Sequence, residues 1–319
     1  MPFELRRVDL AAIDAADETF RLGRIRDVAA LAASIERLGL LCAPIVAGLN
    51  GRQVVVSGFC RVEACRRLGW QEMSARMPRH PAEAWECARW AVAEKAAEGP
   101  LTPLETGKAL RLLRAIASGE DAFRQAVRDF GLPDQPTAQM RLESLCDLPE
   151  VIQAAVDDEA LAVSTAVSLC RMPQATAVRV AGLLAELRFS LNKQREIVTL
   201  LEEISRREGI PVQTVLETPA LAALASDADT DRAQRGHRLR LYLYQRRFPA
   251  LAKAQRRFEL LSHELCLAGN ARLAAPPGFE GRGFQLTLSF SNRPELSSHH
   301  ETIDRILSHC ALDEMFHLA

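Results

Sequence analysis

The sequence predicts an α+β protein: a small mixed-sheet N-terminal domain, an all-helical middle domain and a helical or αβ C-terminal region. Two apolar strands flank an Asn-Gly pair at 50–51, residues after 102 show helical apolar spacing, and residues 284–290 alternate apolar and polar side chains. These patterns divide the chain into an N-terminal domain at 1–100, a helical domain at 101–217, a linker at 218–231 and a C-terminal association region at 232–319.

The N-terminal domain reads as helix, hairpin, helix. Apolar residues at helical spacing over 28–38 precede Gly39, a residue type common at helix ends. A strand at 44–49 turns at Asn50-Gly51 into a second strand at 53–57, and a second helix follows.

The corner between that second strand and the second helix is a candidate anion site. Ser57 and Gly58 form the turn, and Arg61 opens the helix. A helix N-terminus presents unpaired N–H groups and a positive dipole end, glycine permits close backbone approach, and arginine adds a charged donor. This combination favours a phosphate group; the alternative is an ordinary strand-to-helix turn.

The helical domain is predicted to begin with a capped helix. Thr102 is an N-cap residue, Pro103 stands at the first helical position, and Glu105 completes a capping box.

The order of these elements resembles the N-terminal domain of the ParB partition-protein family, whose motifs assemble a CTP site. The family's Ser-Ile helix, Pro-Ile-Val strand, Gly-Glu-Arg-Arg-x-Arg-Ala corner and Glu-Asn-x-x-Arg segment are matched here by Ser34, Ile35, Pro44, Ile45, Val46, Gly58, Arg61, Ala64 and Glu94. Further matches at 101–105, 148–153 and 160–166 extend the resemblance over residues 4–173.

The resemblance implies CTP with Mg²⁺ as cofactor and Glu94 as the catalytic acid of any hydrolysis. The nucleotide-binding residues expected from the corner and the family motifs are Pro44, Ile45, Val46, Ser57, Gly58 and Arg61. Four residues count against CTP and Mg²⁺. Phe59 and Cys60 replace a glutamate and an arginine of the family corner, Lys95 stands where a magnesium-ligating Asn is expected, and Glu98 stands where a phosphate-binding Arg is expected. The sequence therefore predicts a degenerate CTP-type pocket with weakened triphosphate affinity.

Two helices of the middle domain resemble a helix-turn-helix. The first ends near Phe130, the turn begins at Gly131, and the second helix begins at Pro136. The second helix is expected to present Thr137, Gln139 and Arg141 to the major groove of double-stranded DNA. The alternative is an ordinary helix pair, because the turn is longer than usual.

The stretch between Asp231 and Glu259 has no acidic residue and is rich in cations. A cationic helix suits contact with a phosphate backbone. The DNA-contact candidates are Arg235, Arg238, Arg246, Arg247, Lys253 and Arg257. The alternative is a solvated helix face paired with acidic helices around Glu196, Glu202 and Glu203. Pro249 is expected to interrupt this helix.

The C-terminal strand at 284–290 is expected to be half-buried and needs a partner strand, either at 272–274 or from a second copy of the chain. No metal site is expected: the dispersed cysteines, with the exception of Cys60, are interpreted as small core hydrophobes, and His299, His300, His309 and His317 as surface residues.

The amino end has no apolar run of signal-peptide length, so a cytoplasmic, nucleoid-associated protein without membrane contact is expected. The first hypothesis is a dimeric ParB-like DNA-binding protein acting in DNA partition or transcriptional regulation, with a partition ATPase or another protein as a further partner. The second is a protein-interaction adaptor that kept the fold and lost nucleotide and specific DNA binding. The third is an enzyme, either a weak CTPase-type phosphoryl-transfer enzyme or a redox enzyme using Cys60. The corner at 57–61 partly resembles the Gly-Cys-His-Arg corner of sulfiredoxin, although it lacks the histidine.

Overall fold

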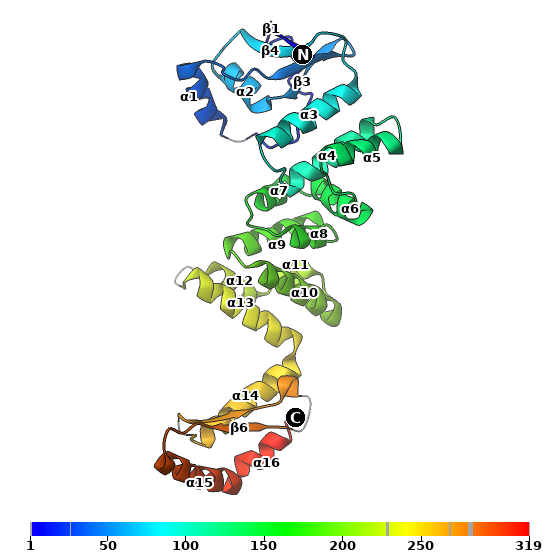
Figure 1. Cartoon of the computed structure of the whole chain (residues 1–319). Coiled ribbons are helices and arrows are strands. Elements are labelled where there is room, and N and C mark those ends of the chain that lie inside the picture. The colour runs from blue at the N-terminus through cyan, green and yellow to red at the C-terminus, as the bar shows by residue number, and fades with distance from the viewer. Residues whose placement is uncertain (1, 26, 228–229, 268, 280–282, 319) are drawn as a thin grey trace. The chain divides into compact units, whose positions relative to one another are not determined.

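The computed structural model describes residues 2–25, 27–227, 230–267, 269–279 and 283–318. Contacts divide the chain into two compact units, Met1–Arg195 and Glu196–Ala319. The dividing point lies inside helix α10 (Leu191–Glu208) and does not coincide with the predicted linker at 218–231. The predicted α+β class is confirmed, since each unit combines helices with a sheet (Figure 1).

A four-stranded mixed sheet forms the N-terminal part of the first unit. Its strands are β1 (Phe3–Asp9), β2 (Ile45–Leu49), β3 (Arg52–Ser57) and β4 (Glu72–Pro78). Their order is β1-β4-β2-β3; β2 runs parallel to β4, and the other two pairs are antiparallel. The predicted hairpin joins β2 and β3, and Asn50 and Gly51 both take positive φ, 52° and 77°, as this turn type requires.

Helices cover both faces of this sheet (Figure 1). Because side chains alternate along a strand, Val46 and Val55 pack with helices α1 (Val28–Leu38) and α2 (Phe59–Arg67). Their neighbours Ile45, Val54 and Val56 pack on the opposite face, with helix α3 (Ala84–Glu98). The site described below lies where α2 and α3 meet the end of β3.

The apolar cluster beneath α3 continues into the helical part of the first unit through Leu110, Leu113, Phe123 and Val127. The helices of this part are α4 (Pro103–Ile116), α5 (Glu120–Asp129), α6 (Pro136–Ser144), the short turn η1 (Leu145–Asp147), α7 (Glu150–Asp157), α8 (Val163–Leu169) and α9 (Gln174–Glu186). The predicted capping box at the start of α4 is present, with hydrogen bonds in both directions between Thr102 and Glu105.

The second unit begins with the remainder of α10. The helices that follow are α11 (Val212–Leu216), α12 (Pro219–Ser226), α13 (Arg232–Arg247) and α14 (Pro249–Glu264). The predicted interruption at Pro249 is confirmed, since α13 ends and α14 begins around Phe248. Residues 219–226 form a helix whose Leu221 is 1% exposed, so this segment is packed rather than a free linker.

The end of the chain is a small αβ structure. Strand β5 (Ala271–Ala274) pairs with β6 (Gln285–Leu288), so the C-terminal strand finds its partner within the chain. The turn η2 (Pro277–Phe279) lies between them, and helices α15 (Arg293–Ser308) and α16 (Cys310–Phe316) follow. The expectation of a half-buried strand is wrong for β6, because three of its four residues are exposed.

Two sequence interpretations need correction. Only Cys65 and Cys87 are buried, whereas Cys42, Cys170, Cys266 and Cys310 are exposed, so core packing does not account for most cysteines. His299 is 2% exposed, and its Nε2 lies 2.9 Å from the carbonyl oxygen of Ser289. This histidine fastens α15 to the end of β6 and is not a surface residue.

Candidate functional site

The corner at Gly58 has the backbone geometry of an anion site. Gly58 takes φ +89° and ψ 31°, a left-handed conformation that favours glycine. A Cβ added there would lie 2.7 Å from the Cβ of Pro44. No side chain among the described residues caps α2. The N–H groups of its first residues, Phe59 and Cys60, have no preceding helical carbonyl to which they could donate. The corner therefore combines close backbone approach with N–H groups that find no acceptor within the helix.

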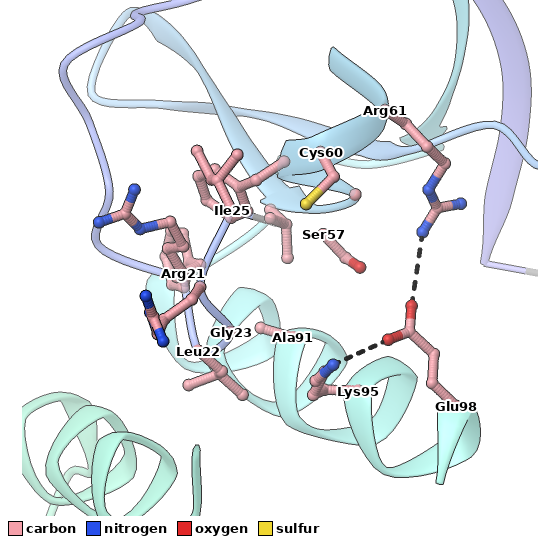
Figure 2. Close-up of a pocket in the computed structure, with 15 residues that line it drawn as sticks. Arg21, Leu22, Gly23, Ile25, Ser57, Cys60, Arg61, Ala91, Lys95 and Glu98 are labelled. Atoms are coloured by element: carbon pink, nitrogen blue, oxygen red, sulfur yellow. Dashed lines mark hydrogen bonds and ion pairs between the residues drawn. The ribbon is translucent and has the colours of Figure 1, made fainter. Parts of the chain in front are cut away.

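A cavity of about 120 Å³ opens at this corner (Figure 2). Its walls come from the end of β3, the first turn of α2, the inner face of α3 and the loop that precedes α1. The charged residues that line it are Arg21, Arg24, Arg61, Lys95 and Glu98. Four cations and one carboxylate thus surround the open N-terminus of α2.

Arg61 belongs to a group of ion pairs that also contains Glu94 and Arg76. Arg61 Nη2 donates to Glu94 Oε1 over 3.4 Å, and Arg76 Nη2 donates to the same oxygen. Backbone carbonyls hold both guanidinium groups, Cys42 for Arg61 at 3.1 Å and Ala43 for Arg76 at 3.0 Å. Glu94 Oε2 is buried and has no hydrogen-bond partner among the described residues. Glu94 therefore acts as the shared counter-ion of two arginines.

Lys95 bridges two carboxylates. Its Nζ lies 3.0 Å from Glu98 Oε2 and 3.2 Å from Glu105 Oε1. Burial lowers the pKa of Lys95, but the hydrogen bonds to these two carboxylates outweigh it, so the pKa stands above its ordinary value. Because Glu105 also accepts from the backbone N–H of Thr102, Lys95 connects the cavity to the first turn of α4.

The two arginines of the loop before α1 are paired as well. Arg21 lies 2.6 Å from Glu18, and Arg24 lies 4.0 Å from Asp158, just after α7. Each cation that lines the cavity therefore has a carboxylate partner. An entering anion would have to compete with these carboxylates for the cations.

The predicted nucleotide-binding residues separate into two groups. The cavity is lined by Ser57, Gly58 and Arg61. Pro44 instead supports the corner from outside, and Ile45 and Val46 are 3% and 0% exposed in the core, where no ligand reaches them. Glu94 lines a neighbouring hollow with Arg76 rather than this cavity. We therefore assign Ile45 and Val46 to packing, because β2 is covered on both faces.

Arg21, Gly23 and Arg24 line the cavity from the loop before α1, and no sequence motif predicted them. A Cβ at Gly23 would lie 3.2 Å from Glu105 Oε1, so the loop passes close to α4. The closely spaced Arg-x-Gly-Arg sequence could have drawn attention to this loop, because it is not part of any helical or strand pattern.

Helix α6 carries the expected DNA-contact residues on different faces. Thr137 and Arg141 are exposed, and the neighbouring Met140 is 66% exposed. Gln139 is 6% exposed; its Oε1 accepts from Arg114 at 2.7 Å and its Nε2 donates to the Pro133 carbonyl at 2.8 Å. The structure corrects the expectation for Gln139, because its amide is used to join α6 to α4 and to the preceding turn.

The arginines of the basic segment are largely paired within the second unit. The ion pairs are Arg238 with Asp227 at 3.4 Å, Arg240 with Glu196 at 2.9 Å, Arg246 with Glu208 at 2.6 Å, Arg247 with Glu203 at 2.6 Å and Arg257 with Glu314 at 2.5 Å. Arg235 donates to the carbonyl of Ala225 at 3.0 Å, and Lys253 is exposed. This pairing corresponds to the alternative left open by the sequence, a helix face neutralised by neighbouring acids.

Among the described residues, no group of three or more His, Cys, Asp or Glu side chains is placed to hold a metal ion. In the same part of the chain, no helix is both long and apolar enough to cross a bilayer.

Comparisons with known proteins found matches among solved structures and none elsewhere. No family model matches the chain, and no curated protein matches it. The chain is similar to C-terminally truncated ParB from Caulobacter crescentus complexed with CTP-γ-S, at 17% identity and a TM-score of 0.27 over 57% of this chain and 99% of that one. It is similar to the same protein complexed to the centromeric parS site, at 17% identity and a TM-score of 0.30 over 61% and 97% of the chains. A Pnob8-like ParB-N domain is 10% identical with a TM-score of 0.36, over 71% of this chain and 94% of that domain. These solved structures belong to the family whose motifs the sequence resembles.

Proposed function

We propose that this chain is a ParB-like DNA-binding protein of DNA partition or transcriptional regulation, with an anion site at Gly58 that takes the phosphate group of a nucleotide. The observation that carries the proposal is the corner itself. Strand, left-handed glycine, open helix N-terminus and Arg61 occur together around one cavity. Backbone donors and a fixed arginine are the groups that recognise phosphate in proteins.

The donor set fits phosphate and does not fit Mg²⁺. Glu94 is held by Arg61 and Arg76, and Lys95 occupies the next position on α3. Mg²⁺ prefers free oxygen ligands, and two cations beside the nearest carboxylate oppose it. The residues at this site therefore do not support a metal-dependent step or hydrolysis. CTP is the nucleotide implied by the resemblance, and the cavity residues support a phosphate contact for it.

The DNA surface of the proposal is the exposed face of α6. Thr137, Met140 and Arg141 lie on that face, and α5 precedes it after a six-residue connection. A helix held by α4 through Gln139 can present these side chains to a major groove as a rigid element. The surface proposed for DNA does not include the arginines of the second unit that are paired with carboxylates.

A second candidate function, a protein-interaction adaptor, is favoured by one observation. In the second unit Arg240, Arg246 and Arg247 are each paired with a glutamate, while Phe290, Leu307 and Phe316 are more than half exposed. Exposed apolar side chains favour association with another protein surface, such as a second copy of the chain or a partition ATPase.

Selection of genomic DNA fragments by the full chain, with and without CTP, tests the first candidate. Wild type is compared with Thr137→Ala/Arg141→Ala and with Arg67→Ala, a control that removes an exposed arginine from α2. We expect one enriched motif with wild type and Arg67→Ala, and its loss in the α6 variant. Absence of an enriched motif with wild type would favour the adaptor, and retention in the α6 variant would exclude α6 as the reader.

A further inference from the structure

The carboxylate of Glu98 lies between two cations of the anion site, Lys95 and Arg61. Glu98, the last residue of α3, places Oε2 at 3.0 Å from Lys95 Nζ and Oε1 at 3.9 Å from Arg61 Nη2. Figure 2 shows Glu98 between these two cations, with Ser57 and Cys60 beside them at the corner. The carboxylate therefore interacts with the same two groups that a phosphate at the corner would use.

Glu98 is held less firmly than Glu94. Its side chain is 53% exposed, whereas that of Glu94 is 18% exposed and is shared by two arginines. A half-exposed side chain at a helix end can turn into solvent when a competing anion arrives. It then still lies at the rim of the cavity, where it repels further negative charge.

We propose that Glu98 is a specificity-determining residue of the anion site, an internal anion that selects for phosphate ligands of low charge. The inference rests on the proposed phosphate contact of the Gly58 corner. Repulsion from the Glu98 carboxylate grows with each negative charge that a ligand brings to the rim, so diphosphates and triphosphates lose more affinity than monophosphates.

The test measures the affinities of the full chain for inorganic phosphate and for pyrophosphate by calorimetry, at one pH and one ionic strength. Glu98→Gln removes the charge and keeps the size of the side chain. Glu63→Gln is the matched control, because Glu63 is an exposed residue of α2 outside the cavity lining and its substitution changes the net charge equally. Circular dichroism and thermal unfolding establish that each variant is folded.

We expect Glu98→Gln to bind pyrophosphate about tenfold more tightly than wild type and phosphate only about threefold more tightly, as expected when one like charge is removed from beside the ligand. Glu63→Gln is expected to leave both affinities within about twofold of wild type, because exposed charges farther from the ligand are screened. Equal affinities of wild type and Glu98→Gln for both probes would overturn the role of Glu98 and leave the anion site standing. An equal gain in affinity in Glu63→Gln would mean that the effect comes from the net charge of the protein. That result would also overturn the role of Glu98. Failure of both folded proteins to bind either probe would refute the anion site itself.

Discussion

Gly58 and Pro44 approach each other so closely that a Cβ on Gly58 would lie 2.7 Å from the Cβ of Pro44. The contact joins the start of β2 to the first turn of α2 and leaves no room for a side chain at the corner. Gly58 also lines the cavity, so its backbone lies at the surface that a ligand would meet.

Gly58→Ala is expected to lower the free energy of unfolding by about 3 kcal/mol, from a left-handed residue and an overpacked contact. Gly69→Ala is the control, because Gly69 also has a positive φ, +72°, but nothing lies within 4 Å of an added Cβ. It should lose about 1 kcal/mol. Urea unfolding of the three proteins measures the difference, and equal losses in the two variants would mean that the Pro44 contact adds no cost.

Arg61→Ala is expected to reduce affinity for inorganic phosphate and CTP to below detection, because the guanidinium group at the first turn of α2 is lost. Arg76→Ala tests whether this is a local effect. Arg76 shares Glu94 with Arg61 but does not line the cavity, so its removal should leave binding within about threefold of wild type. Titration calorimetry of the folded variants measures these affinities. Unchanged phosphate and CTP binding by Arg61→Ala would disprove the assignment of the site.

His299→Ala is expected to lower stability by about 2 kcal/mol, since a buried ring and its bond to the Ser289 carbonyl are both lost. His300→Ala, at the adjacent and largely exposed position, should change stability by less than about 0.5 kcal/mol. Thermal unfolding followed by circular dichroism compares them. Similar unfolding temperatures for the two variants would contradict a structural role for His299.

Glu208 links stability to pH. Hydrogen bonds from Arg246 and Arg207 hold the pKa of Glu208 below its ordinary value despite desolvation. The unfolded chain therefore binds a proton at Glu208 more readily than the folded chain, so this contribution is present above the ordinary pKa of 4.5 and is lost as pH falls through the lower, folded value. Glu208→Gln should cost about 1 kcal/mol at pH 7, and the difference from wild type should disappear in strong acid.

Urea unfolding at a series of pH values checks this, with Glu301→Gln as an exposed control in the same unit. A difference that persists below the folded pKa of Glu208 would show that shape rather than charge is responsible.

The elements with strong local patterns were predictable. Asn50-Gly51 specified the hairpin, Thr102 to Glu105 specified the start of α4, and Pro249 specified the break between α13 and α14. Each depends on backbone preferences of a few adjacent residues, which the sequence contains directly.

The charge pairing of the site was not predictable in the same way. Arg24 and Asp158 are far apart in the sequence and meet only in the fold, and so do Lys95 and Glu105 across two helices. Arg21 and Arg24 lie on an irregular loop, where no periodicity indicates the direction of a side chain. The burial of Gln139 likewise depends on α4, which supplies Arg114 as its partner.

The paired arginines of the second unit have a consequence for how DNA binding responds to salt. A protein cation that neutralises a phosphate releases a counterion, and each such contact steepens the dependence of log K on log salt by about 0.9. Arg240, Arg246 and Arg247 have Glu196, Glu208 and Glu203 as partners, and each pair would have to break before its arginine could neutralise a phosphate. While they stay paired they neutralise no phosphate and displace no counterion from DNA, so the number of arginines in this segment overstates the number of phosphate contacts in a complex. The affinity for DNA should then decline gently between low and physiological ionic strength.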